Sequence, residues 1–150
     1  MKLTIITILA LILTACATPG QWGNYADATP AHSAQMAEDA FKQLTFLYPP
    51  AKSHLSVEQA VNDPFGTLLI QKLRKAGYGV AEQAPLSSSM SRKPTTATAA
   101  PSDLSFNYVV DRISFDHYRV SFNVGGQALG RLYQVHGADL APAGLWAKQE

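Results

Sequence analysis

The stretch YRVSFNVGGQALGRLYQ, from Tyr118 to Gln134, decides the fold of this 150-residue chain. Apolar side chains recur at every second position on both sides of a glycine pair, at Tyr118, Val120, Phe122 and Val124 and again at Leu129, Tyr133 and Val135. This alternation places the apolar side chains on one face of each strand. Two adjacent glycines favour a tight hairpin turn, because they adopt positive φ without strain. We therefore predict two antiparallel strands that are joined at Gly125-Gly126.

A third strand of the same kind precedes this hairpin. Its alternating apolar positions are Leu104, Phe106, Tyr108 and Val110. The three strands together predict an antiparallel meander in the C-terminal half. The tail from Leu140 to Glu150 carries Trp146, which we expect to pack over a sheet edge.

Two amphipathic helices are predicted in the first half. Ser33 is the expected N-cap of the first helix, and Pro49-Pro50 stops it. Asp63-Pro64 starts the second helix with a capping residue followed by proline at the first position, and Gly77 ends it. The apolar positions at helical spacing are Met36, Ala37, Ala40, Phe41, Leu44, Leu47 and Tyr48 in the first helix, and Phe65, Leu68, Leu69 and Leu73 in the second.

These elements predict an α+β fold, a small single domain over 33–150 with two helices and about five strands. Short strands are expected over 53–58 and 78–81, beside the meander. Residues 84–103 are rich in Pro, Ser and Thr and are expected to form a flexible insert. Residues 16–32 are expected to form a flexible tether, because Gly, Pro and small polar residues bury too little apolar surface to fold alone.

The only cysteine, Cys16, follows an apolar stretch that begins behind Lys2. The stretch from Leu3 to Leu13 has the length of a signal-peptide hydrophobic region, about 7–15 residues, and is shorter than the roughly 20 residues that span a bilayer. We predict a signal peptide over 1–15. The other interpretations of Cys16 are an ordinary secretory signal with a coincidental cysteine, or a buried structural thiol.

The run Leu13-Thr14-Ala15-Cys16 resembles a bacterial lipobox. The resemblance implies cleavage after Ala15, a diacylglycerol on the Cys16 sulfur and a further acyl chain on its new amino group. Two or more acyl chains hold a protein stably on a membrane. Ala17 is not the aspartate that signals inner-membrane retention in Gram-negative lipoproteins, so the resemblance implies an outer-membrane anchor facing the periplasm.

Composition argues against a nucleic-acid surface. Loss of Lys2 with the signal peptide leaves 11 of the 12 basic side chains against 11 acidic ones. Electrostatic binding to DNA needs a basic stripe that releases counterions. We therefore expect no direct nucleic-acid binding.

No pattern of catalytic or metal-ligating residues stands out. The four histidines, His32, His54, His117 and His136, do not show the helical spacing of a metal-binding pair. The nearest group of acids with a histidine is Asp111, Asp116 and His117, at a predicted turn, where aspartate is favoured by its own backbone bonding. We expect no enzyme, no metal and no cofactor other than the covalent lipid.

Trp22 and Tyr25 are the only large side chains of the expected tether. Aromatic anchors often dominate binding when a disordered segment docks in a partner's groove, so both residues are candidates for partner binding. The alternative is that Trp22 rests at the lipid headgroups.

Several segments together resemble the TrbH family of conjugal transfer lipoproteins, and only the 84–102 region is left unmatched. They are GNYADAT (23–29), QLTFLYPPAKSHL (43–55), NDPFGTLLIQKLRKAGYGV (62–80), NYVVDRIS (107–114), YRVSFNVGGQALGRLYQ (118–134) and PAGLWAKQE (142–150). The resemblance implies a structural lipoprotein of a type IV secretion system for mating-pair formation. It implies partners among the other channel subunits, in an oligomeric ring, and no enzymatic residues. The alternative is a separate envelope lipoprotein that binds peptidoglycan or localises a secretin.

Overall fold

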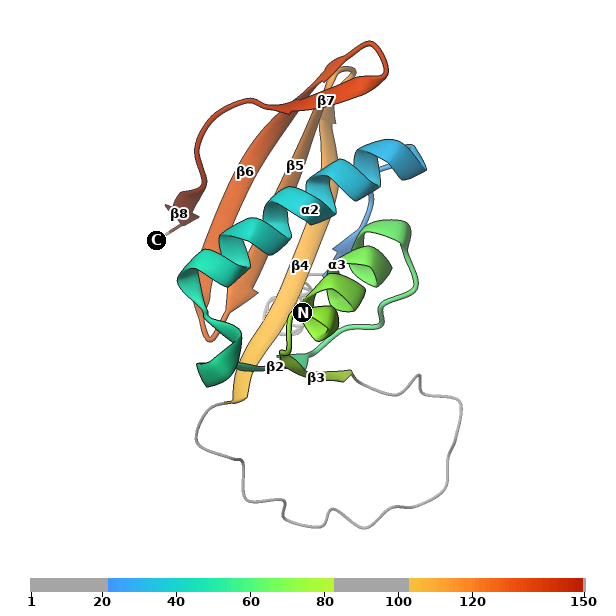
Figure 1. Cartoon of the computed structure of the whole chain (residues 1–150). Coiled ribbons are helices and arrows are strands. Elements are labelled where there is room, and N and C mark those ends of the chain that lie inside the picture. Colours follow the sequence, from blue (N-terminus) through green and yellow to red (C-terminus); the bar gives the residue numbers. More distant parts are fainter. Residues whose placement is uncertain (1–21, 83–102, 150) are drawn as a thin grey trace, which may run out of the picture.

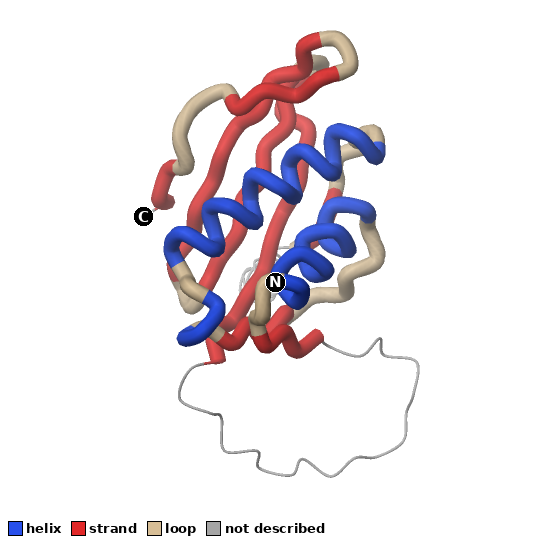
Figure 2. Tube along the Cα trace, viewed as in Figure 1, coloured by secondary structure: helices blue, strands red, loops and turns tan. Residues whose placement is uncertain are grey.

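The computed structural model describes residues 22–82 and 103–149, and in them both helices cover one face of a mixed sheet (Figures 1 and 2). The strand order is β3-β2-β4-β5-β6-β7, with β1 also paired to β4 and β8 to β6. The elements are β1 (Gly23–Asn24), α2 (Pro30–Leu47), the 3-10 helix η2 (Pro50–Lys52), β2 (His54–Val57), α3 (Pro64–Lys75), β3 (Gly79–Glu82), β4 (Asp103–Ser114), β5 (His117–Val124), β6 (Gln127–His136), β7 (Asp139–Pro142) and β8 (Ala147–Gln149).

The predicted α+β fold and its meander are confirmed. Strands β4, β5, β6 and β7 pair antiparallel in chain order. Gly125 and Gly126 have φ of 57° and 86°, and the pair Val124–Gln127 closes the turn between β5 and β6. A two-residue hairpin turn of type I′ requires positive φ at both central residues. Glycine adopts this conformation without strain, which explains the glycine pair.

Strand β4 is the longest in the described residues, and two short strands share its second edge. β2 pairs in parallel with its first part, from Asp103 to Phe106, and β1 pairs in parallel with Val109 and Val110. Between them, the Tyr108 backbone N–H donates to Gln59 Oε1 at 2.8 Å. A side chain thus satisfies the backbone donor at the junction of the two short strands.

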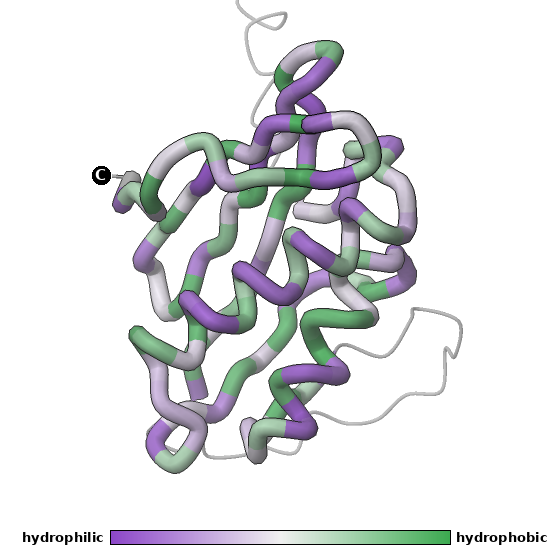
Figure 3. The backbone as a smooth tube through the Cα atoms, turned by 45° about the horizontal axis from the view of Figure 1, so that its top comes forward, coloured by the Kyte–Doolittle hydropathy of each residue, from purple (hydrophilic) through white to green (hydrophobic). Residues whose placement is uncertain are grey.

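The core lies between the sheet and the two helices. The alternating side chains that the sequence predicts on β4 and β5 are buried, apart from half-buried Leu104. Hydrophobic and hydrophilic positions alternate along the strands in Figure 3. On α3, Phe65, Leu69 and Leu73 are buried and Leu68 is half-buried. The fully buried large side chains include Tyr108, Tyr133, Phe65, Phe106, Phe122, Met36 and Leu44.

The first helix begins earlier than predicted. Its N-cap is Thr29, whose hydroxyl accepts from the His32 backbone N–H at 3.2 Å, and Pro30 follows in the first turn. Ser33 is buried inside the helix and is not the cap. A capping residue followed by proline is the signal that correctly located α3, and it applies equally to Thr29-Pro30.

The tether boundary at residue 32 is also wrong. Residues 22–32 belong to the folded domain, because β1 pairs with β4 and α2 starts at Pro30. Residues 16–21 and 84–102 lie outside the described residues, so the expected tether and insert stay predictions there. Asp103, assigned to the insert, is the first residue of β4.

The C-terminal tail adds two strands to the sheet. β7 pairs with the end of β6, and β8 pairs with Ala128–Gly130 near its start. Between them Trp146 packs on Phe122, with ring centroids 4.8 Å apart. The tail strands and β1 are the elements that the prediction of about five strands left out.

Candidate interaction surface

The residues predicted for lipidation, cleavage and sorting lie outside the described residues. They are Leu13, Thr14, Ala15, Cys16 and Ala17. The described chain starts at Trp22, six positions after Cys16. These assignments therefore stay predictions. The structure shows where the chain after Cys16 joins the folded domain.

That entry point is β1, which carries the two predicted partner-binding residues on its flanks. Trp22 is 41% exposed and Tyr25 is 55% exposed. The Tyr25 backbone N–H donates to the Val110 carbonyl at 2.7 Å, so the backbone at Tyr25 is fixed against β4. Both aromatic side chains are thus held on a folded sheet edge, and they are available for contact without the ordering cost of a disordered tail.

One carboxylate fixes this edge to the rest of the domain. Asp63 Oδ1 accepts from the Gly66 backbone N–H and from Asn24 Nδ2, each at 3.0 Å. Asp63 Oδ2 accepts from the Tyr108 hydroxyl. The helix cap predicted from Asp63-Pro64 is confirmed, and the same side chain also joins β1, α3 and β4.

Tyr108 is a buried hydroxyl donor in this cluster. Burial, reinforced by the hydrogen bond to Asp63, raises the pKa of Tyr108 far above its ordinary value of 10.0. The ring also packs edge-on against Phe65, with centroids 5.2 Å apart. The hydroxyl therefore stays protonated over the physiological range and serves as a fixed donor.

The turn between β4 and β5 carries the most exposed aromatic of the described residues. Phe115 is 87% exposed and Ile113 is 49% exposed. The Arg112 guanidinium donates to the carbonyls of Ser114, at 3.2 Å, and Phe115, and it lies 5.6 Å from the centroid of the Tyr118 ring. Figure 3 shows this turn as the loop that projects at the top of the view. The sequence pattern did not single out Ile113 or Phe115.

The acid and histidine group at this turn has the geometry of turn stabilisation. His117 Nδ1 contacts both Asp116 Oδ1, at 2.8 Å, and Ser114 Oγ, at 3.1 Å. A nucleophilic triad needs the acid and the serine on opposite ring nitrogens. The hydrogen bond from His117 lowers the pKa of Asp116 below its ordinary value. Asp111 lies apart from this group and pairs with Arg119 on β5.

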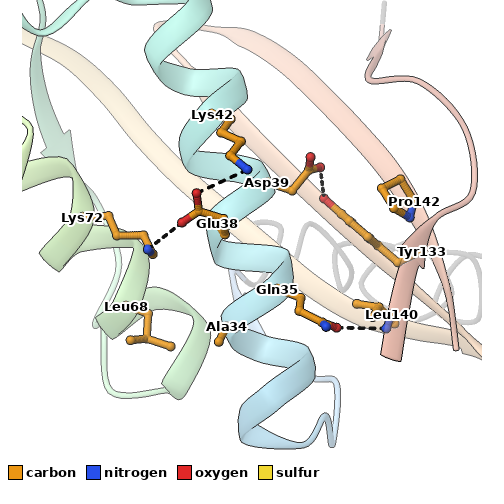
Figure 4. A pocket seen from close by; sticks show the side chains of 10 residues that line it. All are labelled: Ala34, Gln35, Glu38, Asp39, Lys42, Leu68, Lys72, Tyr133, Leu140 and Pro142. Atoms are coloured by element: carbon orange, nitrogen blue, oxygen red, sulfur yellow. Dashed lines mark hydrogen bonds and ion pairs between the residues drawn. The ribbon is translucent and has the colours of Figure 1, made fainter. Parts of the chain in front are cut away.

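A hollow of about 460 Å³ lies along both sides of α2 (Figure 4). On one side Glu38 is paired with Lys72 at 2.6 Å and Lys42 at 3.4 Å. On the other side Asp39 accepts from Tyr133 Oη at 2.7 Å and from Arg131 Nη1 at 2.9 Å. Its charged side chains are thus engaged in holding α2 to α3 and to the sheet.

The remaining histidines are dispersed in the fold. His32 is buried in α2 and hydrogen-bonds the Ala138 carbonyl through Nε2 at 3.2 Å, whereas His54 and His136 are exposed at strand ends. Within residues 22–82 and 103–149, no group of three or more His, Cys, Asp or Glu side chains is placed to hold a metal ion. Likewise, no helix of this part of the chain is long and apolar enough to cross a membrane.

The described residues thus form a small α+β domain with exposed aromatic side chains on the β1 edge and on the β4–β5 turn, which are candidates for contacts with a partner. Residues 18–150 match the family model for the conjugal transfer protein TrbH. The chain therefore belongs to the TrbH family of conjugal transfer proteins, as the sequence resemblance implied. Neither the curated proteins nor the solved structures gave a match to this chain.

Proposed function

We propose that the protein is an outer-membrane lipoprotein that acts as a structural component of a conjugative type IV secretion complex. The observation that carries the proposal is the family match over residues 18–150, which begins two residues after Cys16. The family is defined by conjugal transfer and not by a catalytic activity. The fixed edge with Trp22 and Tyr25 supports a role in contacts with other channel subunits.

In this proposal acylated Cys16 holds the chain at the inner leaflet of the outer membrane, and Ala17 leaves it free of the inner-membrane sorting signal. The folded domain then contributes to an oligomeric ring of the channel. The second candidate is a separate envelope lipoprotein that binds peptidoglycan or localises a secretin. Both functions use the same anchor, so the partner distinguishes them.

The test begins with Cys16→Ser in cells that carry the transfer system. Serine offers no thiolate for diacylglycerol transfer, so we expect the variant to lose palmitate labelling and to leave the outer-membrane fraction. DNA transfer between cells should fall with it. A variant that still incorporates palmitate and still fractionates with the outer membrane would show that the lipobox interpretation is wrong.

The partner is identified by purifying the wild-type protein from membranes and analysing co-purified proteins by mass spectrometry. Channel subunits that are lost with Trp22→Ala, Tyr25→Ala support the proposed role, provided that acylation and protein level are unchanged. Recovery of a secretin alone, or of cell-wall fragments, would favour the second candidate.

A further inference from the structure

We propose that the end of α2 together with η2 lies against the phospholipid surface that carries the Cys16 anchor. This element, residues 46–52, is called the α2–η2 corner below. The inference rests on the acylation in the proposed function and deepens it, because it adds a second, non-covalent membrane contact. It also gives the folded domain one orientation relative to the membrane.

The first support is the direction in which the chain enters the fold. β1 runs parallel to β4, with Gly23 paired to Val109. The chain before Trp22 therefore comes from the end of the sheet at which β4 begins, at Asp103, and not from the end with the β4–β5 turn. Because Cys16 precedes β1, the end of the domain with Asp103 faces the anchor.

The length of chain agrees with this end. Six residue steps separate Cys16 from Trp22, and a fully extended chain of that length spans about 20 Å. Val109 lies six residues after Asp103 on β4, which also corresponds to about 20 Å. A chain that continues the line of β1 thus reaches the level at which β4 begins. To reach the β4–β5 turn, the same chain would have to reverse its direction.

The α2–η2 corner stands at the end of the sheet where β4 begins (Figure 1). η2 ends at Lys52, and β2 starts two residues later at His54, which pairs with Asp103. Only Ser53 separates the corner from this level of the sheet. Phe46, in the last turn of α2, is 81% exposed. The end that faces the anchor therefore carries a large exposed apolar side chain.

The rest of the corner is also apolar, and its backbone is fixed. Pro49 and Ala51 are exposed beside Phe46. The Tyr78 hydroxyl donates to the Tyr48 carbonyl, which holds the chain between Phe46 and Pro49 against the domain. Proline further restricts the backbone, because its ring fixes φ. The exposed apolar groups are thus held in place, and contact with lipid removes their surface from water.

The charges around the corner suit the headgroup region of a phospholipid surface. Residues 40–57 contain Lys42 and Lys52 and no Asp or Glu. Lys42 contacts Glu38 at 3.4 Å, whereas Lys52 is exposed and forms no ion pair within the described residues. Exposed Asp103 is the acidic residue on the adjacent strand. A lysine beside apolar side chains keeps its charge at the headgroups while its stem lies along the apolar surface.

The small apolar area favours lipid over a protein as the occupant of the corner. A stable protein interface buries about 800 Å² on each side, and fully burying one aromatic side chain supplies about 150–250 Å². A lipid contact needs no such area here, because the acyl chains already supply the affinity and the corner only selects an orientation.

The same orientation keeps the other exposed apolar side chains away from the membrane. Phe115 is 87% exposed and Ile113 is 49% exposed, at the end of the sheet with the β4–β5 turn. β4 has 12 residues, so its two ends are 11 residue steps, or about 36 Å, apart. A domain that stands on the α2–η2 corner therefore holds Phe115 in water. The two ends of the sheet make opposite predictions for a fluorescent reporter.

The experiment uses the acylated mature protein in vesicles of phosphatidylcholine and phosphatidylglycerol. The acyl chains of the phosphatidylcholine carry bromine near the headgroup, which quenches tryptophan fluorescence. The reporter variant is Phe46→Trp with Trp22→Phe, and the matched control is Phe115→Trp with Trp22→Phe. Both variants keep half-buried Trp146. We expect blue-shifted emission and loss of most of the added intensity for the Phe46→Trp reporter, whereas the Phe115→Trp control should keep its intensity.

Equal quenching of the two variants would overturn the inference, because the domain would then have no preferred orientation. Stronger quenching of the Phe115→Trp control would also overturn it, since the opposite end would face the lipid. Mass spectrometry of the same preparation measures the acyl chains on Cys16. An unacylated preparation contradicts the proposed function itself, whereas an acylated protein with an unquenched Phe46→Trp reporter contradicts only the lipid contact of the α2–η2 corner.

Discussion

At the scale of single residues, Asp63 and its neighbours show how one short motif serves three elements. The Asp63 side chain caps α3. It also accepts hydrogen bonds from the Asn24 side chain of β1 and from the Tyr108 hydroxyl of β4. Gly66, two residues after the proline, leaves the space that the Tyr108 ring occupies. A Cβ at Gly66 would collide with the Tyr108 hydroxyl and would lie 2.7 Å from Cζ of the same ring.

We predict that Gly66→Ala destabilises the domain by roughly 1–3 kcal/mol, because the ring must move and the hydrogen bond to Asp63 is lost or bent. Urea unfolding of the mature protein measures the change. The control is the same substitution in a Tyr108→Phe background, which lacks the colliding oxygen. The cost of Gly66→Ala should be smaller there, and equal costs in the two backgrounds would show that Tyr108 is not the constraint.

At the scale of elements, two acidic residues at adjacent positions of α2 form ion pairs that differ in burial and therefore in their contribution to stability. Asp39 and Arg131 are 24% and 17% exposed and join α2 to β6, with Tyr133 as a further donor. Glu38 is 42% exposed and pairs with Lys72 and Lys42. The hydrogen bond from Lys72 holds the pKa of Glu38 below its ordinary value, but water screens this surface pair.

We predict that Asp39→Asn costs roughly 1–3 kcal/mol of unfolding free energy, because it leaves the Arg131 charge largely buried without its counter-charge. Glu38→Gln is the matched control on the same helix turn and should cost about 0–1 kcal/mol. Thermal or urea unfolding ranks the two variants. The reverse order would show that α2 is held chiefly by its contact with α3.

Most of the elements that the sequence predicted have a long periodic pattern, and the short strands expected over 53–58 and 78–81 are also found, as β2 and β3. The strands β4, β5 and β6 and the helix α3 follow from alternation, helical spacing and caps, and the structure confirms them. The short strands β1 and β7 have no such pattern, because two to four residues in a Gly- or Pro-containing stretch carry too few positions to show a period. They form because they pair with the free edges of β4 and β6. This pairing depends on the tertiary fold and not on the local sequence.

The candidate surface was predictable only in part. Trp22 and Tyr25 stand out as large aromatics among small residues, and their exposure agrees with a contact role. Their placement on a folded edge depends on the pairing of β1 with Val109 and Val110, and no local sequence pattern predicts this pairing. Ile113 and Phe115 were missed because they lie beyond the alternating apolar positions of this strand and out of phase with them. The usable signal was their position beside Ser114 and Asp116, at the point where the strand must end.

At the scale of the whole molecule, buried tyrosines make stability depend on alkaline pH. Burial, with a hydrogen bond to a carboxylate, raises the pKa of both Tyr108 and Tyr133 above the ordinary value of 10.0. The unfolded chain releases these protons near pH 10, while the folded chain keeps them. The folded state then binds more protons than the unfolded state, so stability is complete below pH 10 and falls as the pH rises above it.

We predict that each of the two tyrosines contributes a loss of about 1.4 kcal/mol per pH unit above its unfolded pKa. Urea unfolding between pH 9 and pH 11 measures the slope for the wild type and for Tyr133→Phe. The titration of lysines is common to both proteins, so the difference between the slopes reports the tyrosine. Identical slopes would contradict the raised pKa of Tyr133.

The entry of the chain through β1 also has a mechanical consequence. β1 runs parallel to β4, and Asn24 is bonded to Asp63 beside it. If the proposed anchor holds Cys16 while a partner pulls the domain along this strand axis, the force acts parallel to β1. The hydrogen bonds between β1 and β4 are then loaded together in shear and do not open one after another. The domain would resist such tension most strongly in the direction that its own tether imposes.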